Sequence, residues 1–298
     1  MKLEINKNRS FTACLRDARD FLIDNIETFA QKVWIPALIF SVLIALCVFF
    51  RLPNLSLHNW GVSHPWTSWI VQTIIYAGTF ISEILYFSSV FNTVNGYGRT
   101  RNFGRYLQYF LVSILVDAVF FLVCWGLKNL FTALIGSHPL SHIAHLTILS
   151  LYVLICVVLF LLITIPMLYV APKYMMEKDA KWKQLFRHFS TGFHRWGMLF
   201  MTTLLLSIII GLIMFILAMP AMVLISAQIS SQMGLFIGDP ANLPGYFPIL
   251  SFLVFTITAL LFSATMIYTI VTFIYVYGSI NTRKKTKEEM TIKYNEKN

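Results

Sequence analysis

The segment YLQYFLVSILVDAVFFLVCWGL, residues 106–127, decides the fold. Its 22 residues include a single charged side chain, that of Asp117. A helix needs about 20 apolar residues to cross the hydrocarbon core of a bilayer. The segment lacks the regular alternation of apolar and polar residues that is typical of a membrane β-barrel strand. It therefore predicts a transmembrane α-helix.

Five further stretches have the same character. Together the six predicted spans cover residues 33–50, 69–92, 106–127, 146–170, 196–226 and 247–280. The composition agrees, because 57% of all residues are hydrophobic and 12% are charged, against roughly 25% charged residues in soluble domains. We therefore expect an all-α polytopic integral membrane protein, with one six-span membrane domain over residues 1–282. This composition excludes a soluble enzyme and a disulfide-stapled secreted domain. Within the fifth stretch, Pro220 predicts a break in the helix.

The basic residues predict the orientation of the spans. Of the 23 lysine and arginine residues, 21 fall before the first span, between spans two and three, between spans four and five, and after the last span. The intervening loops hold only Arg51 and Lys128. Such an asymmetry marks the cytoplasmic side. The net charge of +10 is thus a sign of topology and not of nucleic-acid binding, and both chain ends are expected in the cytoplasm.

Two polar segments carry an apolar stripe with helical spacing. They cover residues 11–32 and 180–195, and each precedes a predicted span. We expect both to be amphipathic helices on the cytoplasmic side, lying in the lipid interface or packing on the membrane helices themselves. Residues 283–298 are expected to be a loose, basic cytoplasmic tail that is attracted to anionic lipid.

A resemblance follows from three features of these segments. They are the surface helix that runs into a span, the glycine-rich basic turn VNGYGRTRNFG at residues 94–104, and the sequences Phe186-Arg187-His188-Phe189 and Phe193-His194-Arg195-Trp196. This pattern resembles an uncharacterised group of bacterial six-helix inner-membrane proteins, similar to the membrane domain fused to some glycerophosphodiester phosphodiesterases. The resemblance implies the fold and an accessory or transport-related role. It implies no catalytic residue, because the chain has no phosphodiesterase domain.

Two acids fall deep inside predicted spans. Glu83 and Asp117 each lie roughly 15–18 Å from the basic end of their span, at 1.5 Å of helix rise per residue. Intramembrane acids usually face a protein interior or a wet cavity. One interpretation is a proton or cation site near the bilayer midplane, in which two close carboxyls share protons. The other is a pair of neutral acids that hydrogen-bond to nearby hydroxyls.

Histidines gather on the expected outer side. His138, His142 and His145 have the spacing of one helix face, and three imidazoles on one face can bind zinc or copper. The alternative is a set of interfacial histidines that bind water and lipid headgroups.

The remaining candidates are contacts with lipid. Trp34, Arg105, Arg195 and Trp196 pair bases with aromatic rings at the expected inner rim, where such residues anchor helices. The chain carries none of the common catalytic or nucleotide-binding motifs. We therefore predict a bacterial-type inner-membrane protein with a non-enzymatic accessory, scaffold or envelope-related role. Its partners are membrane lipids with anionic headgroups, and no cofactor is expected. The alternative function is a proton- or cation-coupled transporter or channel that uses Glu83 and Asp117.

Overall fold

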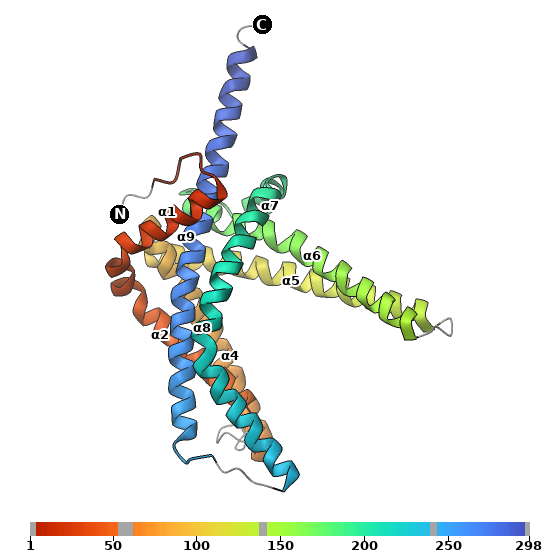
Figure 1. Cartoon of the computed structure of the whole chain (residues 1–298). Helices are drawn as coiled ribbons and strands as arrows, with labels where there is room; N and C mark the ends of the chain where they lie inside the picture. The colour runs from red at the N-terminus through yellow and green to blue at the C-terminus, as the bar shows by residue number, and fades with distance from the viewer. Residues whose placement is uncertain (1–3, 53–61, 137–141, 239–242, 296–298) are drawn as a thin grey trace. The chain divides into compact units, whose positions relative to one another are not determined.

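The computed structural model describes residues 4–52, 62–136, 142–238 and 243–295, and these residues form helices and no strands. Eight helices follow one another along the described chain (Figure 1): α1 (Phe11–Asp24), α2 (Ile26–Arg51), α4 (Pro65–Asn95), α5 (Arg99–Gly136), α6 (His142–Met176), α7 (Gln184–His194), α8 (Trp196–Ile237) and α9 (Phe247–Asn295). The all-α prediction is confirmed.

Six of the helices are long and apolar enough to cross a bilayer, namely α2, α4, α5, α6, α8 and α9. Each contains the stretch predicted to span, or nearly all of it, and most extend beyond it. A helix pairs its interior backbone N–H and C=O groups along the chain, as an apolar medium requires. The chain is a multi-pass integral membrane protein.

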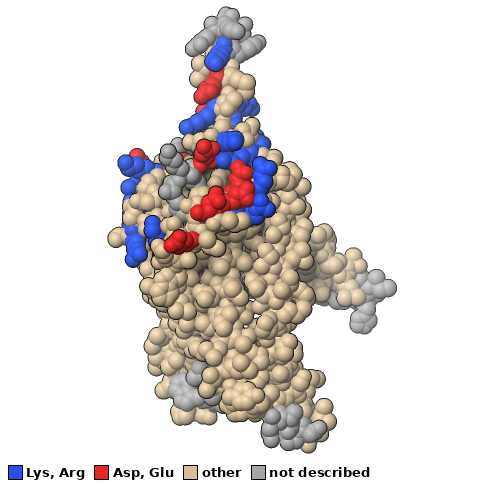
Figure 2. All heavy atoms as spheres, turned by 60° about the vertical axis from the view of Figure 1, so that its left-hand side comes forward, with Lys and Arg blue, Asp and Glu red and all other residues tan. Residues whose placement is uncertain are grey.

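Two helices run on where the sequence predicted otherwise. The break expected at Pro220 is wrong, because Pro220 lies inside the continuous helix α8. The loose tail expected after residue 282 is wrong as well, because α9 continues to Asn295. In that tail Lys284 and Glu288 form an ion pair one turn apart, with 3.8 Å between nitrogen and oxygen. Such pairs support a helix that is already nucleated. Figure 2 shows blue and red side chains along these last turns of α9.

The amphipathic segment predicted over residues 11–32 is divided into two helices. α1 ends at Asp24, and α2 begins at Ile26. Between them the Asn25 side chain donates a hydrogen bond of 2.8 Å to the carbonyl oxygen of Phe21. An asparagine side chain that binds the backbone in this way competes with the helix itself. The end of the predicted segment therefore belongs to a membrane-length helix.

The short helices α1 and α7 each bury one face. α1 buries Leu15, Ala18 and Phe21. α7 packs against α6 and buries Leu185 and His188. Apolar side chains outside these faces stay exposed, and they are Ile23 on α1 and Phe186 and Phe193 on α7. Packing on the membrane helices, one of the two predicted arrangements, thus accounts for one face of each helix, and the exposed side chains are free to contact lipid.

The described chain divides into two compact units. The first comprises residues 15–103 and 204–272. In it α2 packs along α4, and a core forms from Ala45 and Phe49 of α2, Ala221 of α8, and Phe247 and Phe255 of α9. The Phe49 and Phe255 rings meet edge to face, with centroids 6.2 Å apart.

The second unit comprises residues 4–14, 104–203 and 273–298. In it α5 and α6 lie side by side as an antiparallel hairpin (Figure 1), with the Phe120 and Phe160 ring centroids 5.8 Å apart. Near the beginning of α5 and the end of α6, the Tyr174 hydroxyl donates a hydrogen bond to the side-chain oxygen of Gln108 at 2.5 Å.

The N-terminal segment of the second unit clasps the last part of α9. The Ser279 hydroxyl donates to the Arg9 carbonyl oxygen at 2.9 Å and accepts from the Arg9 amide at 3.0 Å. The Arg9 guanidinium lies 4.7 Å from the centre of the Tyr275 ring and donates to the carbonyl oxygens of Glu4 and Ile5. Arg9 is buried, so its charge is satisfied by these backbone oxygens and the ring.

The clasp depends on the absence of a side chain at Gly278. A Cβ atom there would lie much closer to the Ile5 carbonyl oxygen than van der Waals contact allows. Only glycine therefore lets the segment lie on this face of α9.

We expect Gly278→Ala to displace the N-terminal segment. Overpacking of this kind costs about 1–3 kcal/mol, so cleavage by trypsin after Lys7 and Arg9 of the purified protein should rise about tenfold or more. Gly211→Ala is the matched control, because a Cβ atom at Gly211 meets nothing within 4 Å. Equal cleavage of the two variants would contradict the clasp.

Candidate functional site

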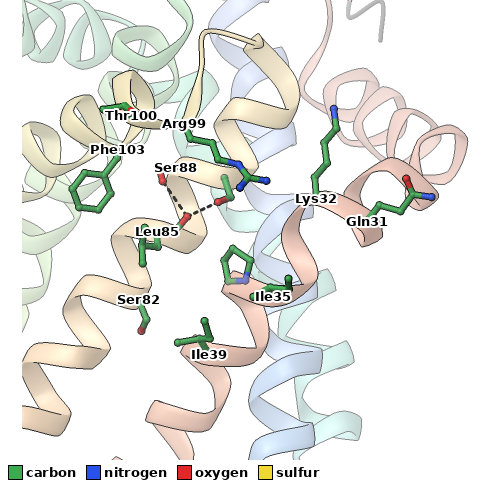
Figure 3. Close-up of a pocket in the computed structure, with 12 residues that line it drawn as sticks. Gln31, Lys32, Ile35, Ile39, Ser82, Leu85, Ser88, Arg99, Thr100 and Phe103 are labelled. Atoms are coloured by element: carbon green, nitrogen blue, oxygen red, sulfur yellow. Dashed lines mark hydrogen bonds between the residues drawn. The ribbon is translucent and has the colours of Figure 1, made fainter.

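A cavity of about 460 Å³ opens in the first unit beside the beginning of α2. The residues that line it come from the first turns of α2, the second half of α4 and the first turn of α5 (Figure 3): Gln31, Lys32, Ile35, Pro36, Ile39, Ser82, Leu85, Ser88, Ser89, Arg99, Thr100 and Phe103. Its volume lies in the range of pockets that bind small molecules, about 300–1,000 Å³.

The cavity has a charged end, formed by Lys32, Arg99 and Thr100, and away from this end its walls are mainly apolar. In Figure 3, Lys32, Arg99 and Thr100 lie toward the upper end, and Ile39 and Ser82 lie toward the lower end. Lys32 and Ile39 are seven residues apart on α2, or about 10 Å along the helix axis. The site therefore offers a cationic end and an apolar wall in one groove.

The two cations of this site are not neutralised. Lys32 and Arg99 are exposed, and neither takes part in an ion pair within the described residues. No acidic residue is among those that line the cavity. Arg99 is also the first residue of α5, so the positive end of the helix dipole adds to the same field. This end of the cavity attracts anions.

The hydroxyl groups of the lining serines donate hydrogen bonds to backbone oxygens of their own helix, α4. The Ser82 hydroxyl donates to the Thr79 carbonyl oxygen at 2.8 Å. The hydroxyls of Ser88 and Ser89 both donate to the Leu85 carbonyl oxygen, at 3.0 and 2.7 Å, as the dashed lines of Figure 3 show. These oxygens keep the capacity to accept a hydrogen bond. The donors available to an anion are therefore Lys32, Arg99 and Thr100.

Three asparagines hold Arg99 in place. Asn102 is fully buried, and its side-chain amide donates to the side-chain oxygens of Asn92 and Asn95 at 3.2 and 3.0 Å. The Asn92 oxygen also accepts from the Gly98 backbone amide at 2.9 Å. Gly96 and Gly98 have φ angles of 67° and 97°, which glycine adopts without strain. The turn that sets the start of α5 against α2 and α4 is thus fixed by side chains at both of its ends.

A second cavity lies on another flank of α2. It has a volume of about 360 Å³ and is bounded by α1, α2 and α9, with almost entirely apolar walls. Trp34, one of the predicted lipid contacts, lines it and is 55% exposed. This groove has the surface of an acyl-chain site and carries no charged side chain.

The other predicted lipid contacts have varied surroundings. Arg105 is buried, and its guanidinium donates to the carbonyl oxygens of Glu177 and Lys178 at 2.7 and 2.5 Å, just past the end of α6. Arg195 is exposed and ends α7. The Trp196 ring stacks on Phe200 with centroids 4.8 Å apart. Lipid contact by these residues stays a prediction.

The two intramembrane acids fall in different compact units. Glu83 lies in the first unit, near the middle of α4, and is half-buried. Asp117 lies in the second unit, near the middle of α5, and is exposed along that helix. Neither lines the two cavities described above. Contact between the two acids stays a prediction.

The predicted histidine site lies outside the described side chains. His138 falls in the undescribed segment 137–141, and the backbones of His142 and His145 begin α6 without a description of their rings. In the part of the chain that the structure describes, no three histidine, cysteine, aspartate or glutamate side chains come together as metal ligands would.

The cavity itself was not predicted from the sequence. Lys32 and Arg99 were assigned to the cytoplasmic rim as general topology signals, and the asparagine network was missed. The pairing of α2 with α4 brings these residues together, and this pairing is a tertiary contact. A usable signal was the turn 92–102, where three asparagines and two glycines stand between long apolar helices.

Comparison with known proteins adds no assignment. No protein-family model, curated protein or solved structure matches the chain.

We expect Asn102→Ala to destabilise the turn that carries Arg99. The change removes the hydrogen bonds that the buried Asn102 side chain makes with Asn92 and Asn95, at a cost of about 1–3 kcal/mol. The thermal unfolding midpoint of the purified protein should fall by about 2–8 °C. Asn281→Ala is the control, because no hydrogen bond of the half-buried Asn281 side chain is described. Equal midpoints for the two variants would contradict the network.

Proposed function

We propose that the protein is a non-enzymatic accessory or scaffold protein of a bacterial-type inner membrane, and that it binds lipids with anionic headgroups at its cytoplasmic face. The observation that carries the proposal is the cavity beside α2, where two unneutralised cations stand above an apolar wall. In this proposal both chain ends are cytoplasmic.

A lipid matches the two parts of this cavity. Its anionic headgroup would accept hydrogen bonds from Lys32, Arg99 and Thr100, and its acyl chain would follow Ile35, Ile39 and Leu85 away from the charges. A soluble anion would use only the first part. The charged end of the cavity lies near the beginning of α2 and at the beginning of α5, where a headgroup would meet a membrane helix.

The chemistry of the lining supports binding rather than catalysis. The residues that line the cavity include no carboxylate, histidine or cysteine, so they offer no general base to activate a nucleophile at neutral pH. The serine hydroxyls donate to backbone oxygens of their own helix. What the lining supplies is charge, hydrogen-bond donors and apolar surface.

The binding of anionic lipid should depend on both bases. We expect the purified protein to retain phosphatidylglycerol in preference to phosphatidylcholine with the same acyl chains, measured as lipid adducts by native mass spectrometry. Lys32→Gln and Arg99→Gln should each lower the phosphatidylglycerol adduct about tenfold, because each removes a charge-assisted hydrogen bond worth about 1.5 kcal/mol.

Lys285→Gln is the control for this experiment. It removes an exposed lysine of α9 that does not line the cavity. An equal loss in all three variants would indicate general attraction to a basic surface, and equal retention of the two lipids by the unmodified protein would contradict the proposal.

Transport is the second candidate, and one observation favours it. Glu83 is half-buried among apolar residues of a membrane-length helix and forms no ion pair within the described chain. A membrane protein that keeps a carboxyl group at this depth commonly uses it for protons or cations.

Flux measurements separate the two functions. If the protein only binds lipid, proteoliposomes that contain it should be no more permeable to protons or sodium ions than empty liposomes. If it transports, Glu83→Gln and Asp117→Asn should each abolish the added flux, because the neutral amides can neither release a proton nor neutralise a cation. Protein-dependent flux that both variants retain would contradict a role for these acids, and flux that both abolish would replace the accessory role with transport.

A further inference from the structure

We infer that the cavity beside α2 selects lipids whose headgroup is a phosphate monoester, as in phosphatidic acid, over lipids whose phosphate is a diester. The inference rests on the proposed binding of anionic lipid and names the headgroup that the site prefers.

The first argument is charge matching. The cavity holds two cations, Lys32 and Arg99, and no acid. A phosphate diester carries one negative charge, and it would leave one of the two cations without a counter-charge. A monoester carries about −1.5 to −2 charges at pH 7, and it neutralises both. When a monoester binds, each cation that loses water therefore gains a negatively charged partner.

The second argument is the set of donors. Lys32 presents an ammonium group, Arg99 presents a planar guanidinium that can grip two oxygens, and Thr100 presents a hydroxyl group. A monoester has three terminal oxygens to accept these bonds, whereas a diester has two. Arg99 and Thr100 are also the first two residues of α5, and the positive end of a helix dipole favours an anion.

The third argument concerns the headgroups that the site rejects. An ethanolamine or choline group carries a positive charge and needs a carboxylate or an aromatic cage. The cavity lining has no carboxylate, and its one aromatic residue is Phe103. Glu27 is not among the lining residues, and its carboxylate accepts a hydrogen bond from the Gln31 amide at 3.1 Å. A zwitterionic lipid would bring its cation toward Lys32 and Arg99.

The ligand is a lipid and not free phosphate because the apolar wall continues beyond the cations. Ile35, Ile39 and Leu85 extend along α2 and α4 from the charged end. Each acyl methylene group that leaves water there strengthens binding. Inorganic phosphate makes none of these contacts.

The test compares lipids with identical dioleoyl chains on the full-length protein in detergent. Titrations with phosphatidic acid, phosphatidylglycerol and phosphatidylcholine are followed by native mass spectrometry at pH 7.5 and at pH 5.5. We expect about tenfold tighter binding of phosphatidic acid than of phosphatidylglycerol at pH 7.5, since one further charge-assisted hydrogen bond forms. The advantage should shrink at pH 5.5, because the second proton of a monoester leaves with a pKa of about 6.

Variants locate the selectivity. Lys32→Gln and Arg99→Gln should each reduce the preference for phosphatidic acid to about twofold or less, because either variant leaves one cation. Lys32→Arg should retain the preference, and Lys285→Gln should leave it unchanged. Inorganic phosphate at 10 mM, roughly a hundred times the lipid concentration, should leave the phosphatidic acid adduct in place if the wall contributes as argued.

The outcomes separate this inference from the proposal beneath it. Equal binding of phosphatidic acid and phosphatidylglycerol, both above phosphatidylcholine, overturns the monoester preference and leaves the binding of anionic lipid intact. Equal binding of all three lipids overturns both. A preference that survives in Lys32→Gln and Arg99→Gln overturns the assignment to this cavity, and displacement by inorganic phosphate overturns the assignment to a lipid.

Discussion

An ionised side chain in the hydrocarbon of a bilayer costs several kcal/mol, and this cost orders the whole chain. It confines the bases to the segments that join the spans or flank them, and it leaves long helices in which almost every side chain is apolar. It also makes each exception informative. A charge that stands near the apolar layer must be neutralised by the protein, must be neutralised by a ligand, or must face water.

The bases of this protein show two of these solutions. Arg9 and Arg105 are buried, and both donate to backbone carbonyl oxygens, Arg105 to those that follow α6. Helix ends leave carbonyl groups without partners, so these arginines serve the fold. Lys32 and Arg99 have no such partner and stand in a cavity. The contrast, within one class of residue, is the reason for assigning binding to the second pair.

The sequence alone predicted the membrane-spanning helices, which depend on the apolar medium around them. It did not predict the features that depend on contacts between helices or on individual side-chain hydrogen bonds. The six spans follow from apolar length, and all six exist as helices. Pro220 misled because proline breaks helices in water. In an apolar segment, an ended helix would leave several backbone groups without partners, which costs more than the one hydrogen bond that proline removes. At Asn25 the sequence predicted one continuous helix, and the structure has two. The Asn25 side chain binds the backbone at the end of α1, and the spacing of apolar residues does not reveal such a bond.

The candidate site could not be predicted because its two cations, Lys32 and Arg99, are 67 positions apart in the sequence. Each of them alone is an ordinary base at the end of a span. They line the same cavity only because α2 packs on α4 and the turn after α4 places the beginning of α5 beside it. That turn is rigid for a reason. The hydrogen bonds of the buried Asn102 side chain with Asn92 and Asn95 hold the start of α5 at one angle, and with it the backbone of Arg99. Lys32 and Arg99 thus line one cavity whose lining holds no acid. An anion that binds there would gain both as partners. The polar network at the turn is therefore understood best as the support of a binding site.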